Sequence, residues 1–100
     1  MTITRKITAD KMAAYLRHEI TISQLVEWAE RAMMEAEFEE EHLSEVREAV
    51  ARLGLADVRA FGLAWEDCEA ILHKLGYAPR IEISAVESER GVKVERKELR

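Results

Sequence analysis

The single proline of the chain, Pro79, marks a change in the spacing of the apolar residues. Before it, apolar side chains recur every three or four residues, which is the spacing of helices that bury one face. After it, the segment RIEISAV (80–86) alternates apolar and polar residues, which is the period of a strand. Because proline breaks a helix interior, the sequence predicts a helical part that ends before residue 79.

Helical spacing predicts four main helices in this part of the chain. They are expected over residues 9–18, 22–34, 39–53 and from about 65 to the glycine at 76, with a short connecting helix over 56–61. The second helix is the best marked, because Thr21 and Gln24 have the spacing of a capping box. Thr8 is the predicted N-cap of the first helix. The expected fold class is therefore mainly all-α, a compact bundle-like domain of four to five helices.

Two similar tetrapeptides, LGLA (53–56) and LGYA (75–78), are predicted to stop the third and fourth helices. Gly54 and Gly76 each stand where a left-handed residue commonly ends a helix. The residue that follows each glycine, Leu55 or Tyr77, can fold back onto the last turn, as in a Schellman motif. Both helices are therefore expected to end in the same way.

The segment after Pro79 is expected to form a strand at 80–86, which 87–91 can turn into a second strand at 92–96. An isolated two-stranded hairpin is marginal in water, so these strands must pack on the helices, pair with a second chain or fray. The expected organisation is one helical domain with a terminal strand over residues 1–86. Residues 87–100 then supply a second hairpin strand and a charged tail.

Composition sets limits on the class of protein. No apolar run approaches the roughly 18 to 20 residues of a membrane span, and the N-terminus lacks the apolar stretch of a secretory signal. Cys68 is the one cysteine, so neither an intrachain disulfide nor a cysteine zinc cluster is expected. It falls on the apolar stripe of the fourth helix, with no histidine placed to activate it. We therefore expect a cytoplasmic, non-enzymatic protein without a cofactor or a membrane partner.

The acidic charge of the chain is concentrated in residues 35–48, called here the acidic segment. It carries seven glutamates against Arg47 alone, a charge of −6, whereas the whole chain has a net charge of −5. Such a distribution repels phosphate backbones, and the basic side chains that supply most of the affinity for nucleic acid are missing. Nucleic acid is therefore not an expected partner.

Glu41, Glu45 and Glu48 are spaced to form one acidic face on the third helix, opposite its apolar stripe. Only Glu48 has a cation four residues on, Arg52, to relieve the repulsion. Such a face is often just solvated, but it can also bind a basic protein. Met34 and Phe38 stand nearby on otherwise polar positions; they either pack against a neighbouring helix or form the apolar centre of an interface. We expect a small acidic protein-binding module, comparable in size and charge to antitoxins or immunity proteins.

Two alternatives come from other features. Glu39 and His42 form a Glu-x-x-His pair, a spacing that di-iron helical bundles use to hold metal. Because a second such pair is missing, a metal site there needs a second chain, in a metal-binding helical homodimer. The simpler interpretation is that Glu39 meets the positive end of its own helix and His42 is a boundary residue. The other alternative is a structural homo-oligomer paired through the C-terminal strands.

Overall fold

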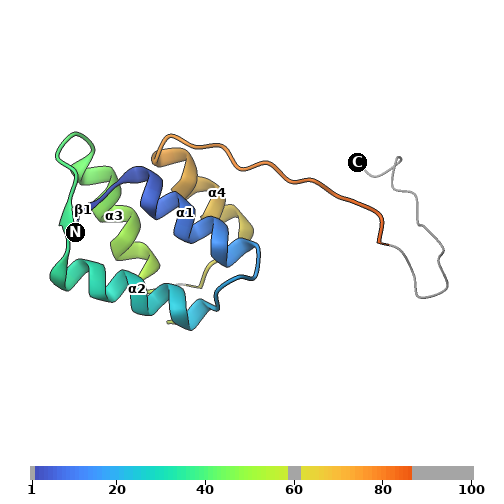
Figure 1. Cartoon of the computed structure of the whole chain (residues 1–100), viewed down its shortest axis with the longest axis horizontal. Coiled ribbons are helices and arrows are strands. Elements are labelled where there is room, and N and C mark those ends of the chain that lie inside the picture. The colour runs from blue at the N-terminus through green and yellow to red at the C-terminus, as the bar shows by residue number, and fades with distance from the viewer. Residues whose placement is uncertain (1, 59–61, 87–100) are drawn as a thin grey trace.

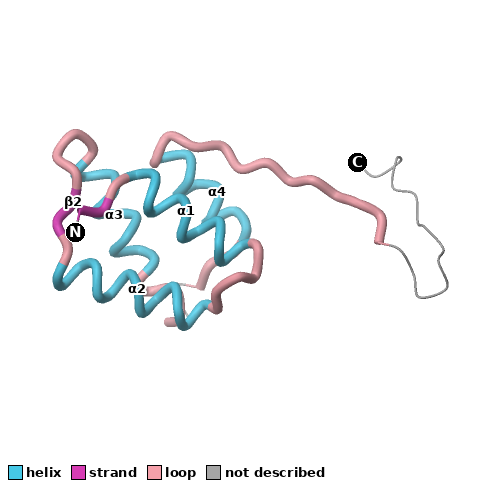
Figure 2. Tube along the Cα trace, viewed as in Figure 1, coloured by secondary structure: helices cyan, strands magenta, loops and turns pink. Residues whose placement is uncertain are grey.

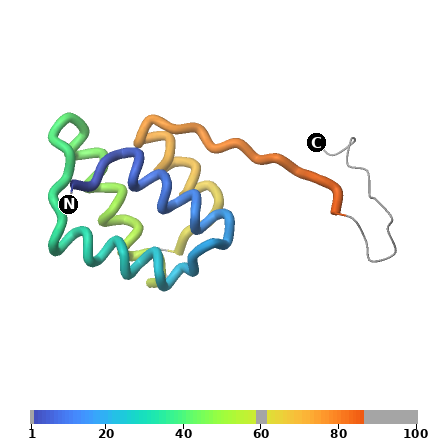
Figure 3. Tube along the Cα trace, viewed as in Figure 1, coloured from blue at the N-terminus to red at the C-terminus, as the bar shows by residue number. Residues whose placement is uncertain are grey.

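The computed structural model describes residues 2–58 and 62–86, in which four helices form one body (Figure 1). The elements in chain order are β1 Thr2–Ile3, α1 Arg5–Leu16, α2 Ile22–Glu35, β2 Glu37–Phe38, α3 Leu43–Leu53 and α4 Trp65–Lys74. Residues 79–86, which follow α4, extend away from the helices (Figure 3). The prediction of a mainly helical, compact domain is confirmed.

The start of α1 differs from the prediction. Thr4 is its N-cap: the Thr4 hydroxyl oxygen accepts a hydrogen bond from the backbone N–H of Ile7 at 3.1 Å. Thr8 lies within the helix, is fully buried, and donates its hydroxyl to the Thr4 carbonyl at 3.0 Å. The predicted N-cap Thr8 and the start at Ala9 are therefore wrong, because Thr4 offers the same capping chemistry one turn earlier.

The end of α1 is a Schellman motif built around a histidine. His18 has a φ of 64°, its N–H donates to the Tyr15 carbonyl at 3.0 Å, and the Glu19 N–H donates to the Ala14 carbonyl at 2.8 Å. These are the two hydrogen bonds of the motif. The helix thus stops at Leu16, two residues before the predicted end.

The prediction for α2 is confirmed. The Thr21 side chain accepts from the Gln24 N–H at 3.1 Å, and the Gln24 side chain accepts from the Thr21 N–H at 2.8 Å, so both halves of the capping box are made. Leu25 and Ala29 are fully buried on its inner face. Local capping and periodicity were sufficient to locate this helix.

The start of α3 was predicted four residues too early. Residues 37 and 38 form β2, which pairs in parallel with β1, with Thr2 opposite Glu37 and Ile3 opposite Phe38 (Figure 2). The Glu39 N–H continues this pairing by donating to the Ile3 carbonyl at 3.0 Å. Because these bonds hold 37–39 extended, α3 begins at Leu43 and its apolar stripe loses Leu43, which is 41% exposed.

The two predicted helix stops are not equivalent. Gly76 has a φ of 94°, and the Tyr77 N–H donates to the Leu72 carbonyl at 2.9 Å, as a Schellman motif requires. Gly54, in contrast, has a right-handed φ of −66°, and the chain continues into further tight turns. The left-handed conformation predicted for Gly54 is therefore wrong, and Leu55 after it is 42% exposed.

The short helix predicted over 56–61 is not formed at 56–58, which lie in turns, and its remaining residues lie outside the described residues. The prediction for α4 is confirmed from Trp65. Its N-cap Ala64 has no side-chain acceptor, but the Asp67 carboxylate accepts the Ala64 N–H at 2.9 Å. Cys68 is buried, as its place on the apolar stripe predicted.

The core lies between the helices, where α3 packs against both α1 and α2. Its largest fully buried side chains come from β1 and all four helices: Ile3, Met12, Leu25, Val46, Val50, Leu53, Cys68 and Leu75. Nine-tenths or more of each is removed from water, which is the main source of stability in a domain of this size. The β1–β2 pair covers one end of this core through Ile3.

The C-terminal strand is not formed at 80–86, which is extended without strand pairing to any described residue. The second strand predicted at 92–96 lies outside the described residues. The alternation of apolar and polar residues in 80–86 therefore corresponds to an extended backbone that has no strand partner among the described residues.

Candidate functional site

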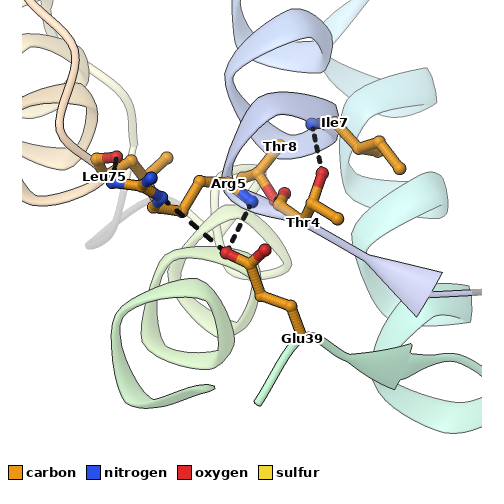
Figure 4. A network of polar contacts seen from close by, with 6 residues as sticks. All are labelled: Thr4, Arg5, Ile7, Thr8, Glu39 and Leu75. Atoms are coloured by element: carbon orange, nitrogen blue, oxygen red, sulfur yellow. Dashed lines mark hydrogen bonds and ion pairs between the residues drawn. The ribbon is translucent and has the colours of Figure 1, made fainter. Parts of the chain in front are cut away.

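Glu39 is bound to the N-terminus of α1 rather than placed on α3 (Figure 4). Its Oε1 accepts a hydrogen bond from the Arg5 N–H at 3.3 Å and lies 3.7 Å from Arg5 Nε. The same guanidinium donates to the Leu75 carbonyl at the end of α4, at 3.5 Å. Arg5 therefore connects the acidic segment to the ends of two helices.

The geometry expected of the Glu-x-x-His pair is not present. Glu39 follows β2 and His42 is the N-cap residue of α3, so the two do not share a helix face, and that expectation was wrong. The His42 side chain makes no capping hydrogen bond. Among residues 2–58 and 62–86, no three His, Cys, Asp or Glu side chains lie together as metal ligands.

The three glutamates of the predicted acidic face are all exposed, but they lie on two elements. Glu45 and Glu48 are on α3, and Glu41 is in the turn that precedes it. The helical spacing expected for Glu41 does not apply, because α3 starts later than predicted. Glu41 is instead presented from the turn that joins β2 to α3.

Arg52 makes its ion pair with Asp67 and not with Glu48, the residue that the helical spacing suggested. Its Nη2 lies 3.7 Å from Asp67 Oδ2 on α4, and it donates to the Gly62 carbonyl at 3.1 Å. Glu48 therefore has no ion pair within 4 Å in the described part of the chain.

Most glutamates of the acidic segment likewise have no ion pair among the described residues. Six of its seven glutamates are exposed and have no ion pair within 4 Å among the described residues: Glu35, Glu37, Glu40, Glu41, Glu45 and Glu48. Glu39, with its side chain 22% exposed, is the exception. The segment thus presents a run of exposed carboxylates of which only Glu39 is held in an ion pair within the part of the chain that is described.

A groove of about 270 Å³ separates α3 from α4 and takes in part of this surface. Glu45 and Glu48 line it from α3, and Asp67 lines it from α4. Its remaining lining is apolar, Ala49, Ala70 and Ile71, or cationic, Arg52 and Lys74. The carboxylates can accept hydrogen bonds from an entering lysine or arginine while its aliphatic stem lies on the apolar floor.

Met34 and Phe38 are not brought together as one anchor. Met34, near the end of α2, is 81% exposed. Phe38 is half-buried and packs against the core, opposite Ile3 in the β1–β2 pair. Met34 is thus the more exposed of the two, and it lies directly before the exposed Glu35.

Cys68, the single cysteine of the chain, has the properties of a core residue. It is 1% exposed, and burial, followed by the nearby Asp67 carboxylate, raises the pKa of its thiol. A raised pKa disfavours the reactive thiolate. This position therefore contributes packing to α4, where a free cysteine behaves as a small hydrophobe.

The chain matches no family model, no curated protein and no solved structure. Over residues 2–58 and 62–86, no helix has the length and apolarity that crossing a membrane requires. The interpretation of the site accordingly comes from its own geometry and charge.

Proposed function

We propose that this protein is a small, non-enzymatic protein-binding module that engages a basic protein through the acidic segment. The observation that carries the proposal is the set of six exposed glutamates without an ion pair in the described residues. Their mutual repulsion is unfavourable in the free protein, and a cationic partner relieves it. A basic ligand therefore supplies these carboxylates with the ion pairs that the described residues do not make.

The α3–α4 groove supports the same proposal. Glu45 and Glu48 stand on its wall, so a cationic side chain of the partner meets carboxylates and an apolar floor together. Met34 gives the surface an exposed apolar side chain next to Glu35. Interfaces combine such apolar contacts with a charged rim that steers and orients the partner.

One concrete form of this function is neutralisation of a basic toxin, as antitoxins and immunity proteins perform. This form rests on analogy of size and charge. It predicts that the partner loses its own activity when bound, which an assay of the purified partner with and without the module measures.

The proposal is tested by affinity capture with three versions of the immobilised protein. They are wild type, the variant E41Q/E45Q/E48Q, and the control E27Q/E30Q/E69Q, which removes the same charge from exposed positions on α2 and α4. We expect a basic protein to be retained by wild type and control at low salt, and about tenfold less by the first variant. Identical sets of retained proteins on all three resins, an empty set included, contradict the proposal.

A further inference from the structure

The segment after α4 presents a row of exposed aliphatic side chains. Residues 79–86, called here the arm, extend away from the helical body (Figure 3). Ile81, Ile83 and Val86 on the arm are 65%, 58% and 78% exposed. Within the described chain, no backbone group of the arm takes part in a backbone hydrogen bond. An extended, apolar segment with unpaired edges is a surface that associates with another chain.

A groove at the base of the arm offers an apolar surface of matching kind. It lies between α1 and α4 and has a volume of about 640 Å³. Ala9, Ala13 and Leu16 line it from α1, and Trp65 and Leu72 line it from α4. The two alanines are one helical turn apart, so their small side chains leave room for an extended backbone to approach.

The arm does not fill the groove of its own chain. Ile81 lines the groove at the arm's base but remains 65% exposed, and Ile83 lies beyond the lining residues. Trp65, at 37% exposure, is also left open on the opposite wall. Among the described residues, therefore, nothing covers the outer part of the arm, and the groove stays open.

We propose that the occupant of the α1–α4 groove is the arm of a second copy of this chain. In this dimer, Ile83 of each copy enters the groove of the other beside that copy's own Ile81. The exchange is isologous, since each copy gives one arm and receives one. It goes beyond the proposed function and does not involve the acidic segment.

The charges on the two surfaces favour this pairing. The groove carries Asp10 and Arg17 along α1, and the arm carries Arg80 and Glu82. In the single chain Asp10 pairs with Lys6 and Arg17 pairs with Glu19, each at 2.9 Å on the exposed surface of α1, whereas Arg80 and Glu82 have no ion pair within 4 Å among the described residues. Exposed pairs of this kind contribute little stability, so Arg80 of one copy can meet Asp10 of the other, and Glu82 can meet Arg17, at the rim of the groove.

The first test is the mass of the full chain in solution, measured by sedimentation equilibrium over a range of concentrations. We expect a dimer whose dissociation constant rises at least about tenfold in I81Q/I83Q. The matched control M33Q/M34Q makes the same change at two exposed residues of α2 and should leave the constant within about twofold. A wild-type chain that stays monomeric, or equal dimerisation of wild type and I81Q/I83Q, overturns the proposal.

The second test identifies the surface that the arm occupies. Chains carrying I83C are mixed with chains carrying A13C in a redox buffer; Cys68 stays in both, because it is 1% exposed. We expect a disulfide-linked pair of the two different chains to dominate. Predominant I83C–I83C linkage means that arms pair with each other and overturns the groove assignment. Circular dichroism of each variant confirms that its helices are intact before either result is interpreted.

Discussion

The Glu39 carboxylate lies at the N-terminus of α1, with Oε1 3.3 Å from the Arg5 backbone nitrogen and 3.7 Å from Arg5 Nε. The first turn of this helix contains no acidic residue of its own and begins with Arg5 and Lys6, whose charges oppose the helix dipole. A carboxylate from 34 residues away supplies the missing negative charge. This contact also attaches the part of the acidic segment between β2 and α3 to the N-terminus of α1.

The first prediction concerns that contact. Glu39→Gln keeps the shape of the side chain but removes its charge, so the dipole interaction and the ion pair are both lost. We expect the free energy of unfolding to fall by about 0.5 to 1.5 kcal/mol, at the lower end because both side chains are partly exposed. Urea denaturation measures the change. Glu40→Gln, at an exposed neighbour without an ion pair in the described residues, is the control and should change it by less than about 0.5 kcal/mol.

The second prediction compares the two look-alike helix stops. Gly76→Ala should destabilise the protein by about 1 to 2 kcal/mol, because its φ of 94° strains an L-residue and the new Cβ would lie 2.8 Å from Arg5 Nη1. Gly54→Ala should instead raise stability by about 0.5 kcal/mol. Its φ is right-handed, and its nearest contact, 3.5 Å to the Ala51 carbonyl, is ordinary. Thermal melts of both variants measure the two changes in stability. Equal changes would contradict the different conformations assigned to the two glycines.

The third prediction concerns the histidine that ends α1. His18 has a φ of 64°, a conformation that costs an L-residue about 1 to 2 kcal/mol and glycine much less. His18→Gly should therefore raise the free energy of unfolding by about 0.5 to 1 kcal/mol, after allowance for the greater freedom of glycine in the unfolded chain. His18→Ala keeps the strain and serves as the control. A glycine variant no more stable than the alanine variant would contradict the assignment of strain to this residue.

The fourth prediction concerns Cys68 at alkaline pH. Because burial raises the pKa of its thiol, the folded state holds the proton more tightly than the unfolded state. The protonated thiol therefore contributes to the free energy of unfolding. This contribution is fully present below the thiol's pKa in the unfolded chain, about 8.5, and is lost as pH rises through its higher pKa in the folded protein. We expect the unfolding free energy to fall more steeply between about pH 8 and 10 in wild type than in Cys68→Ala, which has no thiol. Parallel pH profiles would contradict this.

Local signals were sufficient for part of the fold. The reciprocal bonds between Thr21 and Gln24 involve neighbours in the chain, so α2 could be located from its sequence, and so could the burial of Cys68 from its helical spacing. For α1, Thr4 and Thr8 offer the same local capping chemistry, and the structure uses Thr4. The start of α3 could not be located, because it depends on two-residue strands that pair across more than thirty residues.

The same division applies to the candidate site. The exposure of Glu45 and Glu48 followed from their position opposite the apolar residues of α3. The ion pair of Arg52 with Asp67 depends on how α3 packs beside α4. The local spacing of residues on α3 favours Glu48 as the partner and does not predict this contact. The α3–α4 groove was missed for the same reason. LGLA and LGYA show most directly how little a short sequence pattern determines by itself. The two tetrapeptides are similar, yet Gly76 is left-handed and Gly54 is right-handed.

The central claim is that the acidic segment binds a basic protein by charge, and the association rate constant of the captured partner tests it most directly. Stopped-flow mixing at rising salt should show the wild-type rate constant falling by about tenfold or more, because salt screens long-range attraction. The variant E41Q/E45Q/E48Q should start lower and fall less steeply, while E27Q/E30Q/E69Q should follow wild type more closely. A rate constant that ignores salt, or the same salt dependence in all three proteins, would contradict the claim.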